Sequence, residues 1–466
     1  MAWGVLSLAA PHLYASTSQR PNIILINIDD LGWTDLACNG SGYYETPHID
    51  KLRSLGIWFS QAYAGASNSA PSRACMLTGQ YSPRHGIYTV GNPDRGKAEH
   101  RKLISVPNHT SLPDGFQILT RVLQEAGYQT FHVGKWHVTE DPLTCGIEKN
   151  IAGNHAGHPR SYFAPYRNAN LPDGPDGEYL PDRLGKEAVR LIEGADRTCP
   201  FFLYYATYSV HTPLQAEEEL VRKYKDKAPT EAHNNPVYAA MVEAMDRNVG
   251  RVLQAVFDKG IEENTLIIFT SDNGGVYDIS KQWPLRAGKG SFYEGGIRVP
   301  LIVYQKGRFE RRKIENVSVS QLDIFPTLLD LTGIPFDNLL LDGASLFKLL
   351  RDGKDARIAE RTLYWHFPAY LEGGNDETTD KRFRSRPVSV IRRGEWKLIE
   401  NYETGTYELY NISDDIGERK DLSSEYPQKV QELLKVLNRW KQKVHAPIPD
   451  QLNPAYEERE VADYQL

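Results

Sequence analysis

The sequence predicts an α/β fold, with a large, doubly wound and mostly parallel sheet sandwiched by helices and a smaller C-terminal α+β part that contains an antiparallel sheet. Two observations predict it. Near-continuous apolar runs, such as residues 22–28, alternate with amphipathic stretches such as 237–259, which is the strand, loop and helix order of a parallel sheet. After residue 355 the pattern changes to short strand-like runs joined by short turns. We therefore expect one domain over 20–355 and a subdomain over 356–466.

The elements are expected in the following order. Strands are predicted at 22–28, 57–64, 128–133, 200–207, 265–270 and 301–304, and after the boundary at 363–367, 388–392, 396–400 and 407–410. Helices are predicted at 46–56, 117–126, 184–192, 237–259, 320–331 and 424–444. The first has Thr46 as its cap and Pro47 at its first position, and glycines 127 and 260 close the second and fourth.

Composition limits the possible functions. The chain has 466 residues and 40% apolar residues, which is enough to bury a large core. Its formal net charge of -6 argues against nucleic acid as a partner, so any anion site must be built locally. No run after the N-terminus is long and apolar enough to predict a membrane span.

The N-terminal residues 1–15 are apolar and end in Leu13-Tyr14-Ala15 before a Ser/Thr-rich stretch. This resembles a secretory signal without a basic region, so we expect a leader over 1–19 and a periplasmic or secreted protein; a disordered leader is the alternative. Of the four cysteines, Cys145 and Cys199 could pair in an oxidising compartment, and the sequence leaves this open.

Acidic and amide side chains follow two of the predicted strands. Asp29 and Asp30 come directly after 22–28, and Asp272 and Asn273 come just after 265–270. The carboxyl ends of parallel strands form the usual ligand edge of such a sheet. Adjacent carboxylates repel each other unless a cation lies between them, and calcium or magnesium prefers such oxygen ligands. The alternative for Asp29 and Asp30 is an ordinary Asp-rich turn.

Cationic and proton-carrying side chains follow other strands. Lys135 and His137 come after 128–133 and point to the same side of an extended segment, which suits anion binding and proton transfer. His211 lies past 200–207, and Lys289 lies in a glycine-rich loop. The alternative for Lys135 and His137 is that the lysine extends to solvent and the histidine is packed in the core without a functional role.

Ser69 lies where a loop turns into a helix. Pro71 and the helix formers after it predict that the helix starts here, and the free amides of a helix N-terminus attract negative charge. Arg73, one turn later, could point to the same spot. The alternative is an N-capping serine with a solvated arginine.

The long segment 150–182 is rich in Gly, Pro, Asn and aromatic residues, and long irregular segments are usually functional. Its His155, His158, Tyr162 and Tyr166 could stack on or hydrogen-bond a sugar; a surface flap without a ligand is the alternative.

Taken together, the oxygen ligands and the cationic set describe a metal-assisted site for a compact oxyanion, and phosphate and sulfate esters are the candidates.

These residues resemble a known family. Ser69-Ala70-Pro71-Ser72-Arg73, followed by Leu77-Thr78-Gly79, is similar to the signature of formylglycine-dependent sulfatases, which have an alkaline-phosphatase-like fold. The match extends to 27–30, 134–137, 271–275 and 289–300, and so covers nearly the whole chain. The tyrosine-rich loops resemble those of bacterial exo-acting carbohydrate sulfatases with a serine-type motif.

The resemblance implies a catalytic domain over 20–355 in which a maturation enzyme converts Ser69 to formylglycine (3-oxoalanine). Most members carry cysteine there, so Ser69 indicates either a natural serine-type member or a disabled cysteine-type member. The implied metal is one calcium ion, bound by Asp29, Asp30, Ser69, Asp272 and Asn273.

The resemblance also implies roles for the other residues. Hydrated formylglycine would attack sulfur while Asp272 or His137 takes its proton. Arg73 and Lys135 would hold its hydroxyls, Lys289 would bind the sulfate, and His211 would protonate the leaving oxygen.

The implied substrate is a sulfated saccharide, for which we expect a galactose or N-acetylgalactosamine 4-sulfate, with His366 touching the sugar. Two alternatives remain: a phosphodiesterase or phosphonate hydrolase of the same superfamily, and a non-catalytic carbohydrate-binding relative in which Ser69 stays unmodified.

Overall fold

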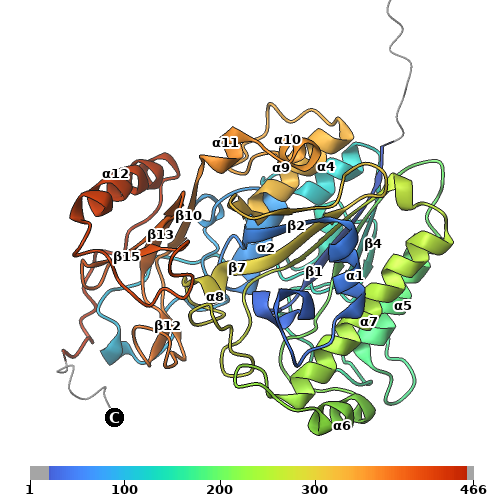
Figure 1. Cartoon of the computed structure of the whole chain (residues 1–466), viewed down its shortest axis with the longest axis horizontal. Helices are drawn as coiled ribbons and strands as arrows, with labels where there is room; N and C mark the ends of the chain where they lie inside the picture. Colours follow the sequence, from blue (N-terminus) through green and yellow to red (C-terminus); the bar gives the residue numbers. More distant parts are fainter. Residues whose placement is uncertain (1–19, 459–466) are drawn as a thin grey trace, which may run out of the picture.

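A nine-stranded sheet forms the centre of the molecule, in the order β4-β3-β5-β1-β6-β7-β2-β8 with β9 paired to β2 (Figure 1). The computed structural model describes residues 20–458, so the expected leader over 1–19 lies outside the described residues. The strands are β1 Asn22–Ile28, β2 Ile57–Tyr63, β3 Gln129–Gly134, β4 Lys149–Ile151, β5 Phe201–Ala206, β6 Thr265–Ser271, β7 Arg298–Tyr304, β8 Arg312–Ile314 and β9 Val319–Ser320.

Strand β7 runs opposite to the rest of this sheet. It pairs antiparallel with β6 on one side and with β2 on the other, whereas the other pairs are parallel. The carboxyl ends of β1, β3, β5, β6 and β2 therefore share one edge of the sheet with the amino end of β7. Residues after the first five strands and residues before β7 can meet there.

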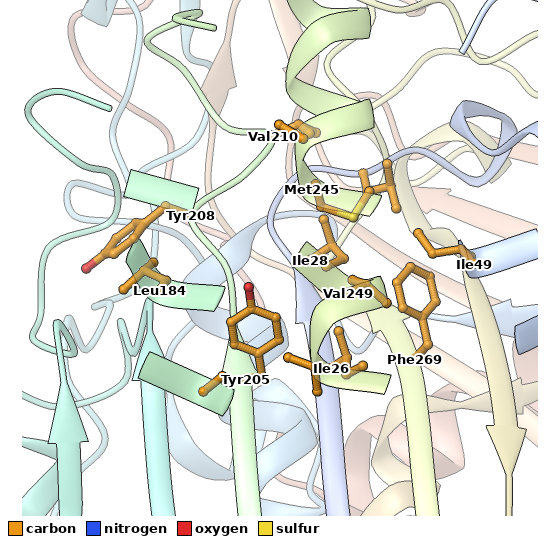
Figure 2. Close-up of a cluster of buried hydrophobic side chains, with 14 of the residues drawn as sticks. Ile26, Ile28, Ile49, Leu184, Tyr205, Tyr208, Val210, Met245, Val249 and Phe269 are labelled. Carbon is orange, nitrogen blue, oxygen red and sulfur yellow. The ribbon is translucent and has the colours of Figure 1, made fainter. Parts of the chain in front are cut away.

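Helices cover both faces of the sheet, as expected from the alternating pattern. Ile24, Ile26 and Ile28 of β1 point into a core formed with α1 (Pro47–Leu55), α5 (Leu180–Glu193) and α7 (Pro236–Asp258). Figure 2 shows part of this core, where Met245 and Val249 of α7 lie over Ile26, Ile28 and Phe269.

The intervening residues Ile23 and Leu25 point to the opposite face of the sheet. There they pack with residues of α2 (Ser69–Thr78), α4 (Leu119–Glu125), α9 (Ile324–Thr332) and α10 (Phe347–Asp352). This alternation along β1 follows from the two-residue period of a strand, and burial on both faces explains why the run is apolar throughout.

The C-terminal part contains a four-stranded antiparallel sheet, in the order β10-β13-β14-β15. Its strands are β10 Thr362–Phe367, β13 Val388–Arg393, β14 Trp396–Asn401 and β15 Tyr407–Asn411, and a hairpin of β11 Leu371–Glu372 and β12 Phe383–Ser385 is inserted before β13. One face of the sheet packs against residues 287–297, and α12 (Pro427–Lys443) covers the other. The predicted fold class is confirmed in both parts.

Shorter helices complete the described chain: α3 Ser82–His85, α6 Glu218–Asp226, α8 Glu294–Ile297, α11 Ala356–Ala359 and the 3-10 turns at Trp33–Asp35, Ala37–Asn39, Ala98–His100, Pro142–Cys145, Glu262–Asn264 and Gln321–Asp323. The helix expected at 320–331 is divided, because Ser320 ends β9 and a 3-10 turn precedes α9.

All four cysteines are free thiols, so Cys145 and Cys199 do not pair in this structure. No helix within residues 20–458 has the length and apolar character needed to cross a bilayer.

Candidate active site

The shared sheet edge gathers most of the residues that the sequence singled out. Asp29 and Asp30 follow β1, Asp272 and Asn273 follow β6, and Ser69 is the first residue of α2 after β2. The Ser69 Oγ lies 3.2 Å from the Asp29 Oδ1 and 3.3 Å from the Asn273 Oδ1. Three oxygen atoms from three separate strand ends thus converge, in a place where Ser69 is only 2% exposed.

Each carboxylate of this group has a cationic partner. The Lys135 Nζ lies 2.8 Å from both oxygens of Asp29, the Arg73 Nε lies 2.8 Å from the Asp272 Oδ2, and the Lys289 Nζ lies 2.7 Å from the Asp30 Oδ2. Asp30 also accepts a hydrogen bond of 2.8 Å from the Asn273 amide nitrogen. The cluster therefore contains as many cationic side chains as carboxylates.

The charges perturb one another strongly in this buried place. Burial raises the pKa of Asp29 to about 7, in spite of Lys135. Burial would raise the pKa of Asp30 as well, but Lys289 and His211 hold it below its usual range. Burial acts on both carboxyls, and the pKa values of these two sequence neighbours are shifted in opposite directions because the cations beside Asp30 outweigh its burial.

Two histidines flank the cluster. Burial lowers the pKa of His211 to about 3, although Asp30 lies nearby. Its Nδ1 donates a proton to the Thr212 carbonyl at 2.7 Å, so the Nε2 is the atom that faces the Asp30 Oδ2 at 3.6 Å. Burial and the positive charges of Lys135 and Arg73 lower the pKa of His137 well below its usual value. His211, 16% exposed in its side chain, and Lys289, 15% exposed, lie at the open side of the cluster.

The segment after β4 covers both histidines. The rings of His158 and His211 are nearly parallel, with centroids 5.9 Å apart, and the His155 ring lies 5.8 Å from the His137 ring. Gly157 passes so close to His137 that a Cβ on it would lie 2.7 Å from the His137 Cε1. The structure thus places the two histidines of this segment at the site, as the sequence pattern suggested.

Tyr162 and Tyr166 of the same segment have a different role from the expected sugar contact. Both are buried, at 0% and 1% exposure. The Tyr162 hydroxyl lies 2.6 Å from the Tyr208 carbonyl and 2.8 Å from the His211 carbonyl, so it supports the turn that carries His211. The Tyr166 hydroxyl bonds the Glu178 carboxylate at 3.0 Å.

His366 is engaged away from the cluster. Its Nδ1 lies 2.7 Å from the Ser389 Oγ and its Nε2 lies 2.8 Å from the Pro447 carbonyl, within the C-terminal subdomain. The residue is 4% exposed. A ring whose nitrogens are both occupied in this way has none to offer a sugar, so the structure does not support the expected contact.

The donor set fits the metal and the modified residue that the sequence implies. Three carboxylates and an amide oxygen are the ligands that calcium prefers. Burial raises the pKa of Asp29 in spite of Lys135, and a bound cation would offset that cost of burying its charge. The buried Arg73 Nη2 and His137 Nδ1 have no hydrogen-bond partner among the described residues. A side chain at position 69 with more oxygen atoms than serine could supply partners.

Several residues that hold the active-site side chains in place could not be identified from the sequence. The Arg73 Nη1 lies 2.9 Å from the Lys135 carbonyl and 3.4 Å from the Tyr204 hydroxyl, and Gln321 accepts from the Ser72 Oγ at 3.0 Å. The Lys289 loop is held by bonds of 2.8 Å from Lys289 N to the Gly275 carbonyl and from Gly290 N to the Ser67 carbonyl. These partners are far apart in the chain, and no local pattern marks them.

Known proteins share this architecture. A family model described as Sulfatase matches residues 21–334, and one described as N-sulphoglucosamine sulphohydrolase, C-terminal, matches 288–445. A sulfatase of Formosa agariphila is 32% identical, over 90% of this chain and 87% of its own. Human N-acetylgalactosamine-6-sulfatase is 29% identical, over 75% of this chain and 68% of its own.

Solved structures agree with the sequence matches. The structure of Ps i-CgsB in complex with k-i-k-neocarrahexaose has a TM-score of 0.76 and 29% identity, and covers 96% of each chain. A phosphonate monoester hydrolase of Agrobacterium radiobacter, at 20% identity and a TM-score of 0.68 over 91% of this chain and 96% of its own, shares the fold.

Proposed function

This chain belongs to the sulfatase family, and from that premise we propose that it removes sulfate from carbohydrates through a formylglycine formed from Ser69 and one calcium ion. The overall reaction adds water to a sulfate ester and yields the free hydroxyl of the sugar and hydrogen sulfate. The convergence of the Ser69 Oγ with oxygens of Asp29 and Asn273, at 3.2 and 3.3 Å, carries this proposal.

Calcium would be held by Asp29, Asp30, Asp272, Asn273 and residue 69. When bound, the calcium ion supplies positive charge to the sulfate oxygens, and formylglycine, once formed and hydrated, supplies the nucleophile. The remaining steps are assigned to side chains that the structure brings to the same place.

Lys289 would bind the sulfate, because its ammonium group lies at the open side of the cluster. Arg73 and Lys135 are fully buried and would hold residue 69 and the charge that develops next to it. Asp272 or His137 would take the proton of the nucleophile.

His211 would act on the leaving oxygen of the sugar through its Nε2, since its Nδ1 is bonded to the Thr212 carbonyl. Because burial lowers the pKa of His211 to about 3, this role requires that the negative charge of the bound sulfate raises that pKa, so that the Nε2 carries a proton to donate. A sugar alkoxide is a poor leaving group, so this proton matters for the rate. His137 and His211 thus stand on the nucleophile side and the leaving-group side of the proposed reaction.

The proposed substrate is a galactose or N-acetylgalactosamine 4-O-sulfate. Support comes from relatives whose names refer to N-acetylgalactosamine and from a structural neighbour crystallised with a neocarrahexaose. Since the named human relative is a 6-sulfatase, substrates with sulfate at either position belong in the test. We also propose that the protein is periplasmic or secreted and that a formylglycine-generating enzyme matures it.

The decisive experiment is a screen of defined sulfated mono- and disaccharides with protein whose Ser69 peptide has been examined by mass spectrometry. Oxidation of serine to formylglycine lowers the peptide mass by about 2 Da, and only such material should release sulfate. Ser69→Ala protein is the control. Modified protein that hydrolyses a phosphate diester faster than a sulfate ester with the same leaving group would instead favour the phosphodiesterase alternative, and native protein with no mass change and no turnover would favour the binding alternative.

Calcium is tested without turnover. Addition of Ca²⁺ to chelator-treated protein should raise the thermal midpoint, because an ion that binds only the folded state at about 100 times its Kd stabilises it by about 2.7 kcal/mol. An Asp272→Asn variant should respond less, and an equal response in both would count against this site.

A further inference from the structure

Arg384 occupies a bulge in the β11–β12 hairpin. Leu371 pairs with Ser385, and the next residue, Glu372, pairs with Phe383, so Arg384 has no partner of its own in the ladder. Extra residues of this kind change the direction of a side chain and are common beside active sites. Phe383 and Ser385 on either side are buried, whereas Arg384 is half-buried.

The side chain of Arg384 lies against the loop that carries Lys289. A Cβ placed on Gly290 would lie 2.9 Å from the Arg384 Cδ and 2.5 Å from the Leu371 Cδ2, so both hairpin side chains contact the residue next to Lys289. Lys289 in turn lies 2.7 Å from Asp30 in the cluster. The hairpin therefore forms part of the rim of the site.

The charge of Arg384 is not neutralised by the protein. Its Nε donates to the Gly373 carbonyl at 2.9 Å, and it forms no ion pair with a carboxylate anywhere in residues 20–458. Arg386, two residues later, pairs with both Asp380 and Glu403. A guanidinium fixed at one nitrogen, with further N–H groups available, suits a sulfate or carboxylate group.

We propose that Arg384 binds a second anionic group, a sulfate or a carboxylate, on the saccharide whose ester sulfate is cleaved. This inference rests on the proposed function and narrows its substrate class to saccharides with more than one negative charge. The ester sulfate itself is assigned to Lys289, so Arg384, on a separate hairpin at the rim, is left to contact another part of the same molecule.

The test compares two saccharides that share the ester sulfate and differ only in a second anionic group, in one arm a sulfate and in another a carboxylate. Arg384→Met removes the charge and keeps the aliphatic stem, whereas Arg384→Lys keeps the charge. A charged hydrogen bond is worth about 10- to 100-fold in binding. We expect Arg384→Met to lower kcat/KM by about that factor for the doubly anionic saccharide and by less than about twofold for the other, with partial recovery in Arg384→Lys.

Lys381→Met, an exposed change in the same hairpin, is the matched control and should affect both saccharides equally. The inference is overturned if Arg384→Met lowers kcat/KM equally for both saccharides, since Arg384 would then act only by supporting the Lys289 loop. It is also overturned if the parent protein does not prefer the doubly anionic saccharide.

Binding separates this inference from the proposed hydrolysis. In full-length Ser69→Ala protein, calorimetric titration of the same two saccharides needs no turnover, and the preference for the doubly anionic one should disappear with Arg384→Met. If that preference and its loss are observed while wild-type protein releases no sulfate, the hydrolytic proposal fails and the Arg384 site stands. If wild-type protein releases sulfate but shows no preference for the doubly anionic saccharide, the hydrolytic proposal stands and the Arg384 site fails.

Discussion

Asp29, Asp30 and Asp272 each have one cation, in Lys135, Lys289 and Arg73 respectively. When all three carboxylates are ionised, which a bound cation favours, the three cationic side chains balance them, and the divalent ion then leaves the cluster positive. A positive, water-poor pocket favours an anionic ester over a neutral one. This balance explains how a chain with a net negative charge can offer a local site for an anion.

Gly157 lies against His137, and this close approach sets the first prediction. In Gly157→Ala, the new Cβ would lie 2.7 Å from the His137 Cε1 and 3.0 Å from its Nε2, so the ring must move. Misplacement of a catalytic group by about 1 Å can cost up to about 100-fold in rate. We expect kcat to fall roughly 10-fold or more with an unchanged thermal midpoint, and the exposed Ala156→Ser change in the same segment serves as control. Unchanged kcat would mean that the position of His137 is not critical.

His366 leads to a prediction about pH. Burial lowers its pKa to about 4, from 6.5 in an unfolded chain. Between these values the unfolded state binds more protons, so stability falls as pH falls, by up to about 1.4 kcal/mol per pH unit. In His366→Gln, the free energy of unfolding by urea should depend less on pH between 6.5 and 4, and sulfate release should be unchanged.

Exposed His445→Gln is the comparison for this measurement, and it should leave the pH profile as in the parent. Burial also lowers the pKa of His132 to about 4, so the unfolding free energy of His366→Gln should still fall somewhat as the pH falls. A loss of turnover in His366→Gln at unchanged stability would restore the sugar contact expected from the sequence.

Among the elements, the strand ends were the most predictable feature. An apolar run such as β1 followed at once by Asp29 and Asp30 identifies both a buried strand and its ligand edge. The direction of β7 could not be predicted in this way, because an apolar run reads the same in a parallel and an antiparallel strand. That direction is why Lys289 reaches the site from a loop before its strand, whereas Lys135 reaches it from a loop after one.

His366 shows the limit of the same rule. It also lies near the end of a strand, but β10 belongs to the antiparallel sheet, and its ends do not coincide with the ligand edge. The pattern after residue 355 assigns this strand to the C-terminal sheet, but it does not show how that sheet lies relative to the ligand edge.

A buried carboxylate of α7 binds the first turn of α1, in addition to their apolar contacts, which gives a prediction for these elements. Asp246 of α7 accepts hydrogen bonds from the backbone of His48 and Ile49, at 3.1 and 2.8 Å, in the first turn of α1. Asp246→Ala leaves both donors without this acceptor and should lower the unfolding free energy by about 1–3 kcal/mol. Glu243→Ala in the same helix removes a partly exposed ion pair with Lys223 and should cost less than about 1 kcal/mol. Equal losses in the two variants would contradict this capping role.

For the molecule as a whole, a buried ionic group joins the two sheets. The Lys397 ammonium on β14 lies 3.1 Å from the Glu294 carboxylate and 2.8 Å from that of Glu418, and all three side chains are fully buried. Glu294 also accepts from the Tyr63 hydroxyl of β2 at 2.9 Å. Residues 63, 294, 397 and 418 are so distant in the chain that no spacing in the sequence reveals this group, although residues 63 and 397 belong to strands that were predicted.

Lys397→Met should therefore destabilise the protein strongly. Removal of Lys397 leaves the buried Glu418 carboxylate without its cation, whereas Glu294 keeps Arg298 at 3.2 Å, and breaking a buried pair typically costs about 3–5 kcal/mol. Because Glu294 begins α8 just after the Lys289 loop, kcat/KM should fall in the remaining folded protein as well. The comparison is Lys420→Met, which removes an exposed ion pair with Glu425 and should change the unfolding free energy by less than about 1 kcal/mol. A small effect of Lys397→Met would show that the apolar contacts between the sheets suffice.

The hairpin that carries Arg384 has a consequence for how new specificities could arise. It is a short two-stranded insertion between β10 and β13, and it contacts the loop that carries Lys289 at Gly290 and, through Glu377, at Trp283 and Arg286. The length and side chains of the hairpin can therefore change by mutation, or be replaced by those of a relative, while the active-site residues on the large sheet are kept. Libraries randomised over residues 373–384 are therefore a direct route to variants that process differently decorated glycans.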